Sequence, residues 1–536
     1  MFLIPRKLYP LLRILHKPVS AVLPNLSLGD VLFLFVFIAV EYAVCASAIK
    51  KLDFGKSLGS AIQWNMAFLL LPVTKRVSPL LVIANIPFER AVRFHRWIAY
   101  VTIIITLLHF FFLVFNNNMA DFSNIAGLIS MSSFLAMFLT SLAVMRRRVY
   151  DSFMKIHYVL APTAYVFAII HQDASGLILR CIAPFLVFLA DWISRFFLVV
   201  RRKATIISTN LVSREGEQRI VQWEIVVENV GHETFRTPGQ YVYLYIPSLK
   251  WSQMHPFSIA YTRECNDEER LHSDISNGAR STRTVLGFFI RDLGSYTAEM
   301  TKLKVENPAE RPRVWVDGPF GSCALDISAY KNFVMIAGGV GITSILNYWN
   351  VIVRTASRST YTAIKLTENA VVDEDQATTT TQHSASLAAY WTVKACDVLF
   401  AISVLRKMQL PTLYLSEASD NKAPNPSFKI TLHFTRLAGI RDDEVDELRR
   451  CISELTNIAV DVVFGTNRVA ITELLAQAVV DGVAADCKKT ARFAVLACGP
   501  ESLMNHVRSA SATLSGSAIP PFTSAVFDVH TETFEF

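Results

Sequence analysis

The sequence of 536 residues has few charges and lacks any cysteine pattern typical of a bound metal or a disulfide framework. Charged residues make up 18% of the chain and hydrophobic residues 52%, which is too apolar for an ordinary soluble protein. The eight cysteines are scattered without a CxxC pair, so we expect reduced thiols rather than zinc ligands or structural disulfides. A calcium loop of the DxDxDG type is also absent, which argues against direct control by calcium.

The excess of basic residues is small and unevenly placed. Lys and Arg number 52 against 45 Asp and Glu, and they cluster beside apolar runs, as at residues 146–148 and 201–203. This pattern indicates membrane topology rather than nucleic-acid binding. The basic residues near the start of the chain are separated by short apolar stretches without a clean signal-peptide core, so we expect a cytosolic segment there.

Most of the apolar residues lie in roughly the first 200 positions, where six stretches are each long enough, or nearly so, to cross a bilayer as a helix. They lie near residues 30–49, 60–74, 94–116, 124–145, 156–175 and 177–200. Lys and Arg gather before the first stretch, between the second and third, between the fourth and fifth, and after the sixth. This distribution predicts that the N-terminus and the region after residue 200 face the cytosol.

Two pairs of histidines with equal spacing lie in these apolar stretches. His95 and His109 are 14 positions apart. His157 and His171 have the same separation. On a helix, 14 steps of about 100° return to nearly the same face, about 21 Å further along the axis.

If the two helices pack side by side, they build two stacked bis-imidazole sites across one membrane. Two axial histidines suit a haem whose iron carries electrons rather than binding a ligand. A single membrane histidine is open to the simpler interpretation of a packed or hydrogen-bonding residue. Two pairs with identical spacing favour haem ligation, because membrane-embedded histidines are rare and usually functional.

The pattern of the chain changes after residue 203 and again near residue 331. Short alternating runs separated by Gly and Pro first predict a small antiparallel β-barrel, at 219–227, 241–246, 286–290 and 313–316. Apolar strands at 333–336, 429–434 and 493–497 then alternate with helical stretches at 342–355 and 389–408, which is typical of a parallel sheet. We therefore expect three domains, at residues 1–203, 204–325 and 326–536.

Two short motifs in the second domain have the chemistry that a flavin needs. The HPFS string at residues 255–258 can supply a hydrogen-bonding group beside the isoalloxazine ring and polar contacts for the pyrophosphate. The GSYT string at 294–297 can bring backbone N–H groups and a hydroxyl to a phosphate. Each string is weak evidence alone, and an ordinary turn is the alternative interpretation of the second.

Two motifs in the third domain follow apolar strands. The AGGVGIT segment at 337–343 opens a helix, and its glycines allow close approach to a nucleotide pyrophosphate, although the spacing is not GxGxxG. The Cys498-Gly499-Pro500 turn follows the strand at 493–497, so it is expected at the sheet edge where such folds bind ligands. Cys498 is a candidate neighbour of the nicotinamide, with a buried small residue as the alternative.

The whole set of motifs resembles the ferric reductase / NADPH oxidase superfamily of membrane flavocytochromes. The set comprises the paired histidines, HPFS, GSYT, the DGPFG turn at 317–321, GGVGIT, CGP and the terminal ETFEF. The resemblance covers nearly the whole chain. It implies a six-helix transmembrane bis-haem bundle, then an antiparallel β-barrel FAD domain, then an α/β parallel-sheet NADPH domain like that of ferredoxin-NADP reductases.

The resemblance also implies roles for individual residues, with no catalytic residue beyond the cofactor contacts. The axial ligands of two b-type haems would be His95, His109, His157 and His171. FAD would contact His255, Pro256, Phe257, Ser258, Gly294 and Thr297, and Phe536 would stack on the flavin. NADPH would contact Gly338, Gly339, Gly341 and Thr343, with Cys498, Gly499 and Pro500 near the nicotinamide.

The sequence departs from the pattern of this family at two places in the third domain. The glycine loop of the family commonly continues with Pro after Thr, and this chain has Ser344. The family often has Gly-Arg-Pro late in the domain, and the matching segment here reads GTNR at 465–468. The second departure puts recognition of the 2′-phosphate by Arg468, and hence the preference for NADPH over NADH, in doubt.

The function implied is electron transfer from cytosolic NADPH through FAD and two b-type haems to an acceptor outside the cytosol. We expect Fe(III)-chelates as acceptor, with Cu(II) as a further one. The equal spacing of the histidines and the short outer loops favour this reductase over a superoxide-generating NADPH oxidase, the main alternative. A haem-containing electron-transfer partner without its own acceptor, and a non-catalytic membrane scaffold, remain as alternatives of other classes.

The expected partners follow from this function. They are membrane lipid and the metal chelate, without nucleic acid, and a homo-oligomer is compatible with the sequence. The expected location is the plasma membrane, with an endomembrane as the alternative.

Overall fold

The computed structural model of the chain describes most of its residues. They are 14–15, 18–20, 26–49, 53–76, 88–114, 121–171, 178–214, 217–228, 230–250, 253–265, 283–305, 312–321, 323, 325–369, 386–411, 427–436, 440–465, 470–483 and 491–532. The chain divides into two compact units, built mainly from Gly29–Phe197 and from Leu198–Glu535. Each unit is described by itself.

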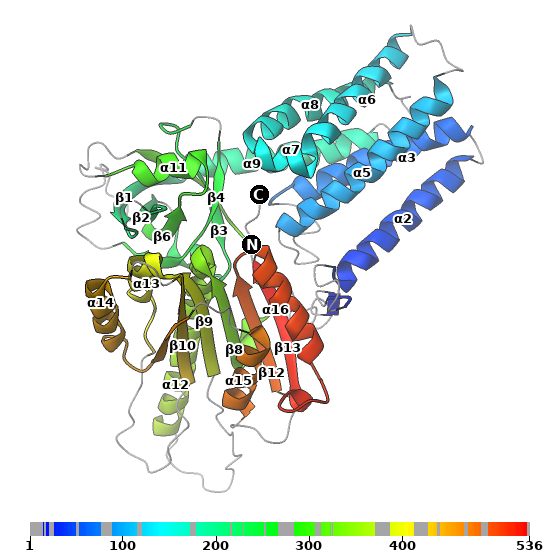
Figure 1. The fold of residues 1–536 in the computed structure, drawn as a ribbon. Helices are drawn as coiled ribbons and strands as arrows, with labels where there is room; N and C mark the ends of the chain where they lie inside the picture. Colours follow the sequence, from blue (N-terminus) through cyan, green and yellow to red (C-terminus); the bar gives the residue numbers. More distant parts are fainter. Residues whose placement is uncertain are drawn as a thin grey trace. The chain divides into compact units, whose positions relative to one another are not determined.

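The first unit is made of helices (Figure 1). They are α2 (Leu28–Ile49), α3 (Phe54–Leu70), α5 (Phe88–Leu113), α6 (Phe122–Ser141), α7 (Ala143–Arg148), α8 (Tyr150–His171) and α9 (Ala183–Arg201), with short 3₁₀ and π turns at Leu71–Val73 and Ile178–Ile182. Within the described residues, α2, α5, α6, α8 and α9 are long and apolar enough to cross a membrane. The predicted stretch at 60–74 falls mostly in α3, which has only 17 residues.

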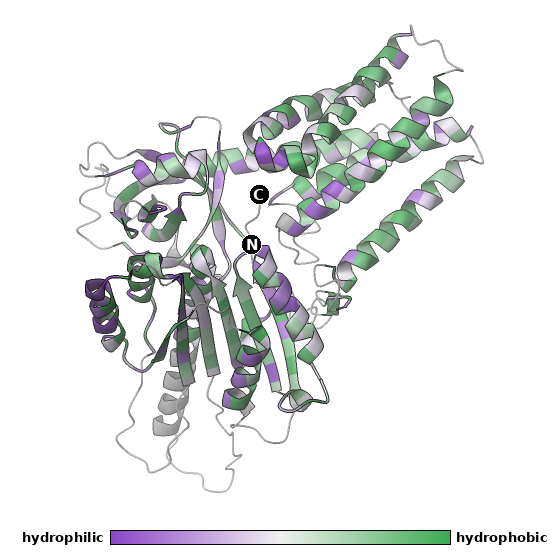
Figure 2. Cartoon of the chain, viewed as in Figure 1, coloured by the Kyte–Doolittle hydropathy of each residue, from purple (hydrophilic) through white to green (hydrophobic). Residues whose placement is uncertain are grey.

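The outer surface of this unit is covered by apolar side chains, which are stable only in an apolar surrounding. Large apolar residues point outward, and Phe35 and Ile38 on α2 are 70% and 61% exposed. Figure 2 shows that hydrophobic residues dominate these helices. The buried Asp30 carboxylate on α2 is paired with Arg90 on α5 at 2.9 Å, so its charge is compensated inside the unit. The predicted membrane character of this part of the chain is therefore confirmed.

The second unit begins with an antiparallel sheet and one helix, α11 (Ser295–Lys302). The strands are β1 (Lys203–Leu211), β2 (Ile220–Glu228), β3 (Tyr241–Tyr245), β4 (His255–Ser258), β5 (Tyr261–Glu264), β6 (Arg283–Arg291) and β7 (Arg313–Phe320). Their order is β4-β3-β7-β1-β2-β6-β5, with every pair antiparallel. Trp223, Phe235 and Phe288 fill its core.

The two edge strands β4 and β5 are consecutive in the chain. They are separated only by Ile259 and Ala260, whose N–H groups donate to Gln240 and Gly287 at 3.0 and 2.9 Å. The HPFS motif is therefore held by the pairing of β4 with β3 and, just after its last residue, by the backbone hydrogen bonds of Ile259 and Ala260. The four predicted strand segments 219–227, 241–246, 286–290 and 313–316 coincide with β2, β3, β6 and β7, so the antiparallel sheet is confirmed.

A parallel sheet follows, in the order β11-β10-β9-β8-β12-β13. Its strands are β8 (Asn332–Gly338), β9 (Ser386–Lys394), β10 (Ser427–Thr435), β11 (Ala459–Phe464), β12 (Ala491–Cys498) and β13 (Ala525–Glu532). Its helices are α12 (Ile342–Asn369), α13 (Val398–Leu405), α14 (Asp442–Ser453), α15 (Ile471–Val483) and α16 (Glu501–Leu514). The first three helices share one buried cluster with the sheet, and α15 and α16 share another. The parallel α/β domain is confirmed.

One prediction for this sheet was wrong. The segment 389–408 was expected to be helical, but its first part belongs to β9, and the helix α13 begins only at Val398. β9 lies between β8 and β10, and its residues from Leu387 to Trp391 are all buried. A strand that is buried on both faces has a continuous apolar run, and such a run does not differ in periodicity from a buried helix.

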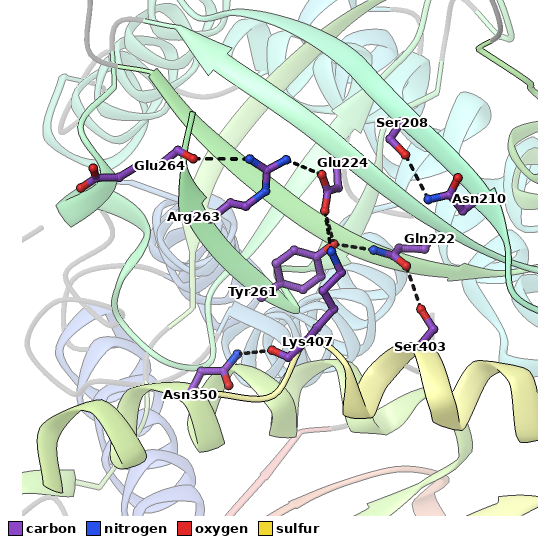
Figure 3. A network of polar contacts seen from close by, with 10 residues as sticks. All are labelled: Ser208, Asn210, Gln222, Glu224, Tyr261, Arg263, Glu264, Asn350, Ser403 and Lys407. Atoms are coloured by element: carbon purple, nitrogen blue, oxygen red, sulfur yellow. Dashed lines mark hydrogen bonds and ion pairs between the residues drawn. The ribbon is translucent and has the colours of Figure 1, made fainter. Parts of the chain in front are cut away.

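A buried polar network around Glu224 fastens the two sheets to each other (Figure 3). The Glu224 carboxylate on β2 accepts hydrogen bonds from Tyr261 at 2.7 Å, Arg263 at 2.6 Å and Lys407 at 3.0 Å. Lys407 follows α13 of the parallel-sheet domain, whereas Tyr261 and Arg263 lie on β5. Burial by itself raises the pKa of Glu224, but these three hydrogen bonds outweigh it and lower the pKa to about 2.

Further contacts extend the network across the same boundary. The Ser403 hydroxyl on α13 donates to the Gln222 side chain at 2.7 Å, and Gln222 donates to the Tyr261 hydroxyl at 2.6 Å. Arg291 on β6 pairs with the buried Asp397 at 3.1 Å. These contacts fix the antiparallel sheet against the parallel sheet, which is necessary for any site that both domains contribute to.

We predict that Glu224→Gln lowers the free energy of unfolding by about 2 kcal/mol at pH 7, because the change leaves the partly buried Lys407 and Arg263 without a counter-charge. The lowered pKa of Glu224 means that its contribution is complete above about pH 4.5 and is lost as the pH falls toward 2. Urea unfolding of the detergent-solubilised protein, followed by tryptophan fluorescence, measures the difference between the two proteins.

The control is Asp461→Asn, which removes an exposed partner of Lys429 and should change the free energy of unfolding by less than about 0.5 kcal/mol. The difference between wild type and Glu224→Gln should begin to shrink only below about pH 4.5. A difference that stays constant down to pH 3 would contradict the assignment of this stability to the ionised carboxylate.

Candidate functional site

The structure brings the four membrane histidines together in the two expected pairs. His95 on α5 faces His157 on α8, with ring centres 6.3 Å apart. His109 on α5 faces His171 on α8 with ring centres 6.2 Å apart. Both pairs come from the same two helices because each helix carries its histidines 14 positions apart, which returns them to one face.

The two separations fit an iron atom between each pair of rings. A metal–imidazole nitrogen bond is about 2 Å long and the ring centre lies about 1 Å further, so two rings on opposite sides of one metal have centres about 6 Å apart. The near-perpendicular ring planes, at 71° and 76°, exclude direct stacking of the imidazoles. The residues present therefore fit two bis-histidine metal centres.

Backbone carbonyl groups orient three of the four rings. The Nδ1 atom of His95 lies 2.9 Å from the Leu69 carbonyl oxygen, and that of His109 lies 2.7 Å from the Gly55 carbonyl oxygen. The Nδ1 atom of His171 lies 2.7 Å from the carbonyl oxygen of Ser123. An Nδ1–H that donates to a carbonyl leaves Nε2 with its lone pair free, which is the arrangement of a metal-ligating histidine.

The helix α3 is important for both pairs, although the sequence reasoning gave it no role. Leu69 and Gly55 lie near its two ends, so one helix orients a histidine ring of each pair. His157 differs from the others, because its buried Nδ1 atom has no hydrogen-bond partner within the described part of the chain.

Two glycines make room for the second pair of histidines. A Cβ atom at Gly59 on α3 would lie 2.9 Å from Cε1 of His109, and one at Gly127 on α6 would lie 2.8 Å from Cε1 of His171. Such distances require one of the groups to shift. Sequence reasoning missed both residues, although a glycine inside an apolar helix is a recognised sign of close packing.

The two flavin motifs lie beside each other in the second unit. The His255 ring on β4 stacks on Tyr296 of α11, with ring centres 4.3 Å apart. Gly294 caps this helix, and the Thr297 hydroxyl accepts from the backbone N–H groups of Leu293 and Gly294, both at 2.9 Å. A Cβ atom at Gly294 would have no heavy atom within 4 Å, so the start of the helix is open to a ligand.

A lysine that sequence reasoning missed lies at this same helix end. The Lys250 ammonium group donates to the Ser295 hydroxyl at 2.8 Å. A cation beside the N-terminus of a helix is a suitable arrangement for a phosphate group.

The glycine loop and the CGP turn meet at the carboxyl ends of β8 and β12. A Cβ atom at Gly341 would lie 2.4 Å from the Cys498 carbonyl oxygen, and one at Gly338 would lie 3.0 Å from Cδ of Pro500. Glycine is therefore required at 341 so that the two backbones can approach. The strand β8 has β9 on one side and β12 on the other, so the order of the strands reverses at β8. The glycine loop follows β8 and therefore lies at the point of the sheet where ligands commonly bind.

The remaining predicted residues are accounted for as follows. The Thr343 hydroxyl donates to the Val340 carbonyl at 3.0 Å, which stabilises the glycine loop itself. Gly339 has a positive φ of 55°, which glycine adopts without strain. Cys498 is buried, and burial raises the pKa of its thiol, so it stays protonated. Phe536 and Arg468 lie outside the described residues.

Three protein families match consecutive parts of the chain. The ferric reductase like transmembrane component matches residues 58–169, and the FAD-binding domain matches residues 225–324. The ferric reductase NAD binding domain matches residues 330–512. The matched segments include both flavin motifs, both nucleotide motifs and three of the four histidines, and His171 lies two residues beyond the end of the first match.

Individual relatives are distant. Ferric reduction oxidase 4 of Arabidopsis thaliana is 26% identical over 306 residues, which is 55% of this chain and 40% of that protein. A superoxide-generating NADPH oxidase heavy chain of Dictyostelium discoideum is 23% identical over 334 residues, which is 54% of this chain and 46% of that protein. The matches thus span less than half the length of these curated relatives.

Among solved structures, a ferredoxin-NADP+ reductase from Plasmodium falciparum with 2'P-AMP matches at 13% identity and a TM-score of 0.31, covering 63% of this chain and 97% of that chain. A flavohemoglobin from Malassezia yamatoensis matches at 12% identity and a TM-score of 0.32, covering 89% of this chain and 96% of that chain.

The three consecutive family matches agree with the motifs of the sequence, and the chain belongs to the ferric reductase / NADPH oxidase superfamily.

Proposed function

We propose that this chain is a transmembrane oxidoreductase that moves electrons from NADPH, through FAD and two b-type haems, to an acceptor on the other side of the membrane. The observation that carries the proposal is the pair of bis-histidine centres on α5 and α8. Their ligands are spaced by about 21 Å along the helices, so two haems would form a path across most of the hydrocarbon layer. In this proposal α3 completes a six-helix bundle.

The chain's own residues would hold the cofactors as follows. His95 and His157 would ligate the inner haem, and His109 and His171 the outer one. FAD would supply the conversion of a two-electron hydride into single electrons. The β4 motif would contact the flavin ring, while Lys250 and the start of α11 would contact its phosphates. The closing of the antiparallel sheet through Ile259 and Ala260 supports a barrel for this domain.

We propose an Fe(III)-chelate as the acceptor, with Cu(II) as a further one, at the plasma membrane. Iron held by two histidines would carry electrons rather than bind a ligand, which suits reduction of a bulky chelate. The names of the plant relatives support iron reduction. One relative is named a superoxide-generating oxidase, so reduction of oxygen is the second candidate. Purified protein supplied with NADPH separates the two by iron(II) formation against superoxide formation.

We predict that His109→Ala or His171→Ala removes the outer haem and abolishes iron reduction, because each change takes one of its two axial ligands. Reduction of the flavin by NADPH should survive, since its motifs lie in the other unit. The measurements are haem content per chain, the reduced-minus-oxidised spectrum and iron(II) formation. Thr163→Ala on α8 is the control, because its hydroxyl bonds to Val159 of the same helix. Full iron reduction by either histidine variant would refute the ligand assignment.

The glycines beside the outer pair provide an independent test. Gly127→Ala and Gly59→Ala should reduce the haem content from about two toward one per chain, since the new methyl group displaces a ligand ring. Gly231→Ala is the control, as nothing lies within 4 Å of its added Cβ atom. Haem content equal to that of the wild type in both variants would show that the outer site tolerates displacement of these rings.

We propose NADPH rather than NADH as the donor, although the segment at 465–468 departs from the family pattern. The expected result is a kcat/KM for NADPH at least about tenfold above that for NADH, which corresponds to about 1.4 kcal/mol of transition-state binding. Steady-state measurements with both nucleotides decide the matter. A tenfold preference for NADH would overturn this choice.

A further inference from the structure

The start of α12 contacts the flavin motif directly. The Ser344 hydroxyl donates to the Ser258 hydroxyl at 3.1 Å, and the Asn347 amide donates to the Ile259 carbonyl at 2.8 Å. Residues three positions apart lie on one face of a helix, so this face of α12 lies against the end of β4. Ser344 and Asn347 are 1% and 5% exposed, and water therefore does not compete for these contacts.

Burial raises the pKa of the Cys498 thiol, and the nearby Ser344 hydroxyl lowers it in part. Cys498 ends β12 and is 1% exposed. Ser344 is therefore near one residue of the proposed flavin site, Ser258, and one of the proposed nicotinamide site, Cys498. The three side chains come from β4, α12 and β12, which are far apart in the sequence.

The hydrogen-bonding capacity of a serine gives this arrangement a direction. A hydroxyl has one donor and two acceptor positions. Ser344 uses its one donor for Ser258. Ser258 in turn accepts from Ser344, so its own O–H is free to donate to another acceptor. Buried hydrogen bonds that point the same way strengthen one another.

We propose that Ser344 is a positioning residue for hydride transfer, which orients the Ser258 hydroxyl as a donor toward the flavin. This inference rests on the proposed function. Ser344 touches neither cofactor in this proposal and acts through Ser258.

At position 344 the hydroxyl can be removed by substitutions that leave the helix backbone unchanged. The family that the sequence resembles commonly has Pro here, and Pro has no side-chain hydrogen-bonding group. Ser344 is the third residue of α12, where a backbone N–H has no intrahelical partner, so the backbone tolerates Pro. Ser344→Pro and Ser344→Ala therefore remove the same hydroxyl in two different ways.

The test measures flavin reduction by NADPH in the full-length, FAD-loaded protein by anaerobic stopped-flow absorbance. Ser344→Ala and Ser344→Pro should each slow flavin reduction at saturating NADPH by about fivefold, the scale of one neutral hydrogen bond. The Kd for NADPH should stay within about twofold, because the hydroxyl does not contact the nucleotide. Ser511→Ala is the matched control, since Ser511 is a fully buried serine of the same domain, and its rate should equal that of the wild type.

A double-mutant cycle with Ser258→Ala distinguishes positioning from a general structural effect. If Ser344 acts through Ser258, adding Ser344→Ala to Ser258→Ala should change the rate by less than about twofold. Additive losses, or a Ser344→Ala rate equal to that of the wild type, would overturn the inference and leave the proposed function intact. A wild-type protein whose bound flavin is reduced by neither nucleotide would overturn both.

Discussion

The arrangement of the first unit depends on how the imidazole rings of its histidines are oriented among apolar helices. An imidazole presents one donor and one acceptor nitrogen, and an apolar surrounding offers few partners for either. Backbone carbonyls of α3 and α6 accept the Nδ1 proton of three rings. Leu69 lies in the last turn of α3, where carbonyl groups lack their usual intrahelical donors. The same hydrogen bond therefore satisfies a carbonyl group at a helix end and fixes the orientation of the His95 ring.

The second unit depends on charged and hydroxyl groups held between two sheets. Glu224 receives three hydrogen bonds, one of them from Lys407 of the other domain. Ser344 and Asn347 donate hydrogen bonds to residues at the end of the flavin motif. The contacts of Glu224 fix the antiparallel sheet against the parallel sheet. The contacts of Ser344 and Asn347 align the residues where the two sheets meet. A site shared by two domains needs both, because small displacements weaken the catalytic geometry.

Periodicity and motif spacing predicted most of the architecture. The apolar stretches, the antiparallel strands and the parallel sheet were found because each has a distinct hydrophobic pattern. The segment 389–408 was misassigned because a fully buried strand and a buried helix have the same continuous apolar run. The short helix α3 was recognised as an apolar stretch, but its part in orienting two histidines depends on carbonyl groups, which every residue has.

The sequence by itself determined which histidines could form the two pairs. Equal spacings of 14 positions match on two helices, and the predicted membrane topology makes these two helices run in the same direction. The sequence also determined the motifs for the flavin and the nucleotide. Only the tertiary structure decided what lies around them. Ser258 and Ser344 are 86 positions apart, and Gly127 and His171 lie on different helices. Contacts of this kind depend on how elements pack, and packing leaves no local pattern in the sequence.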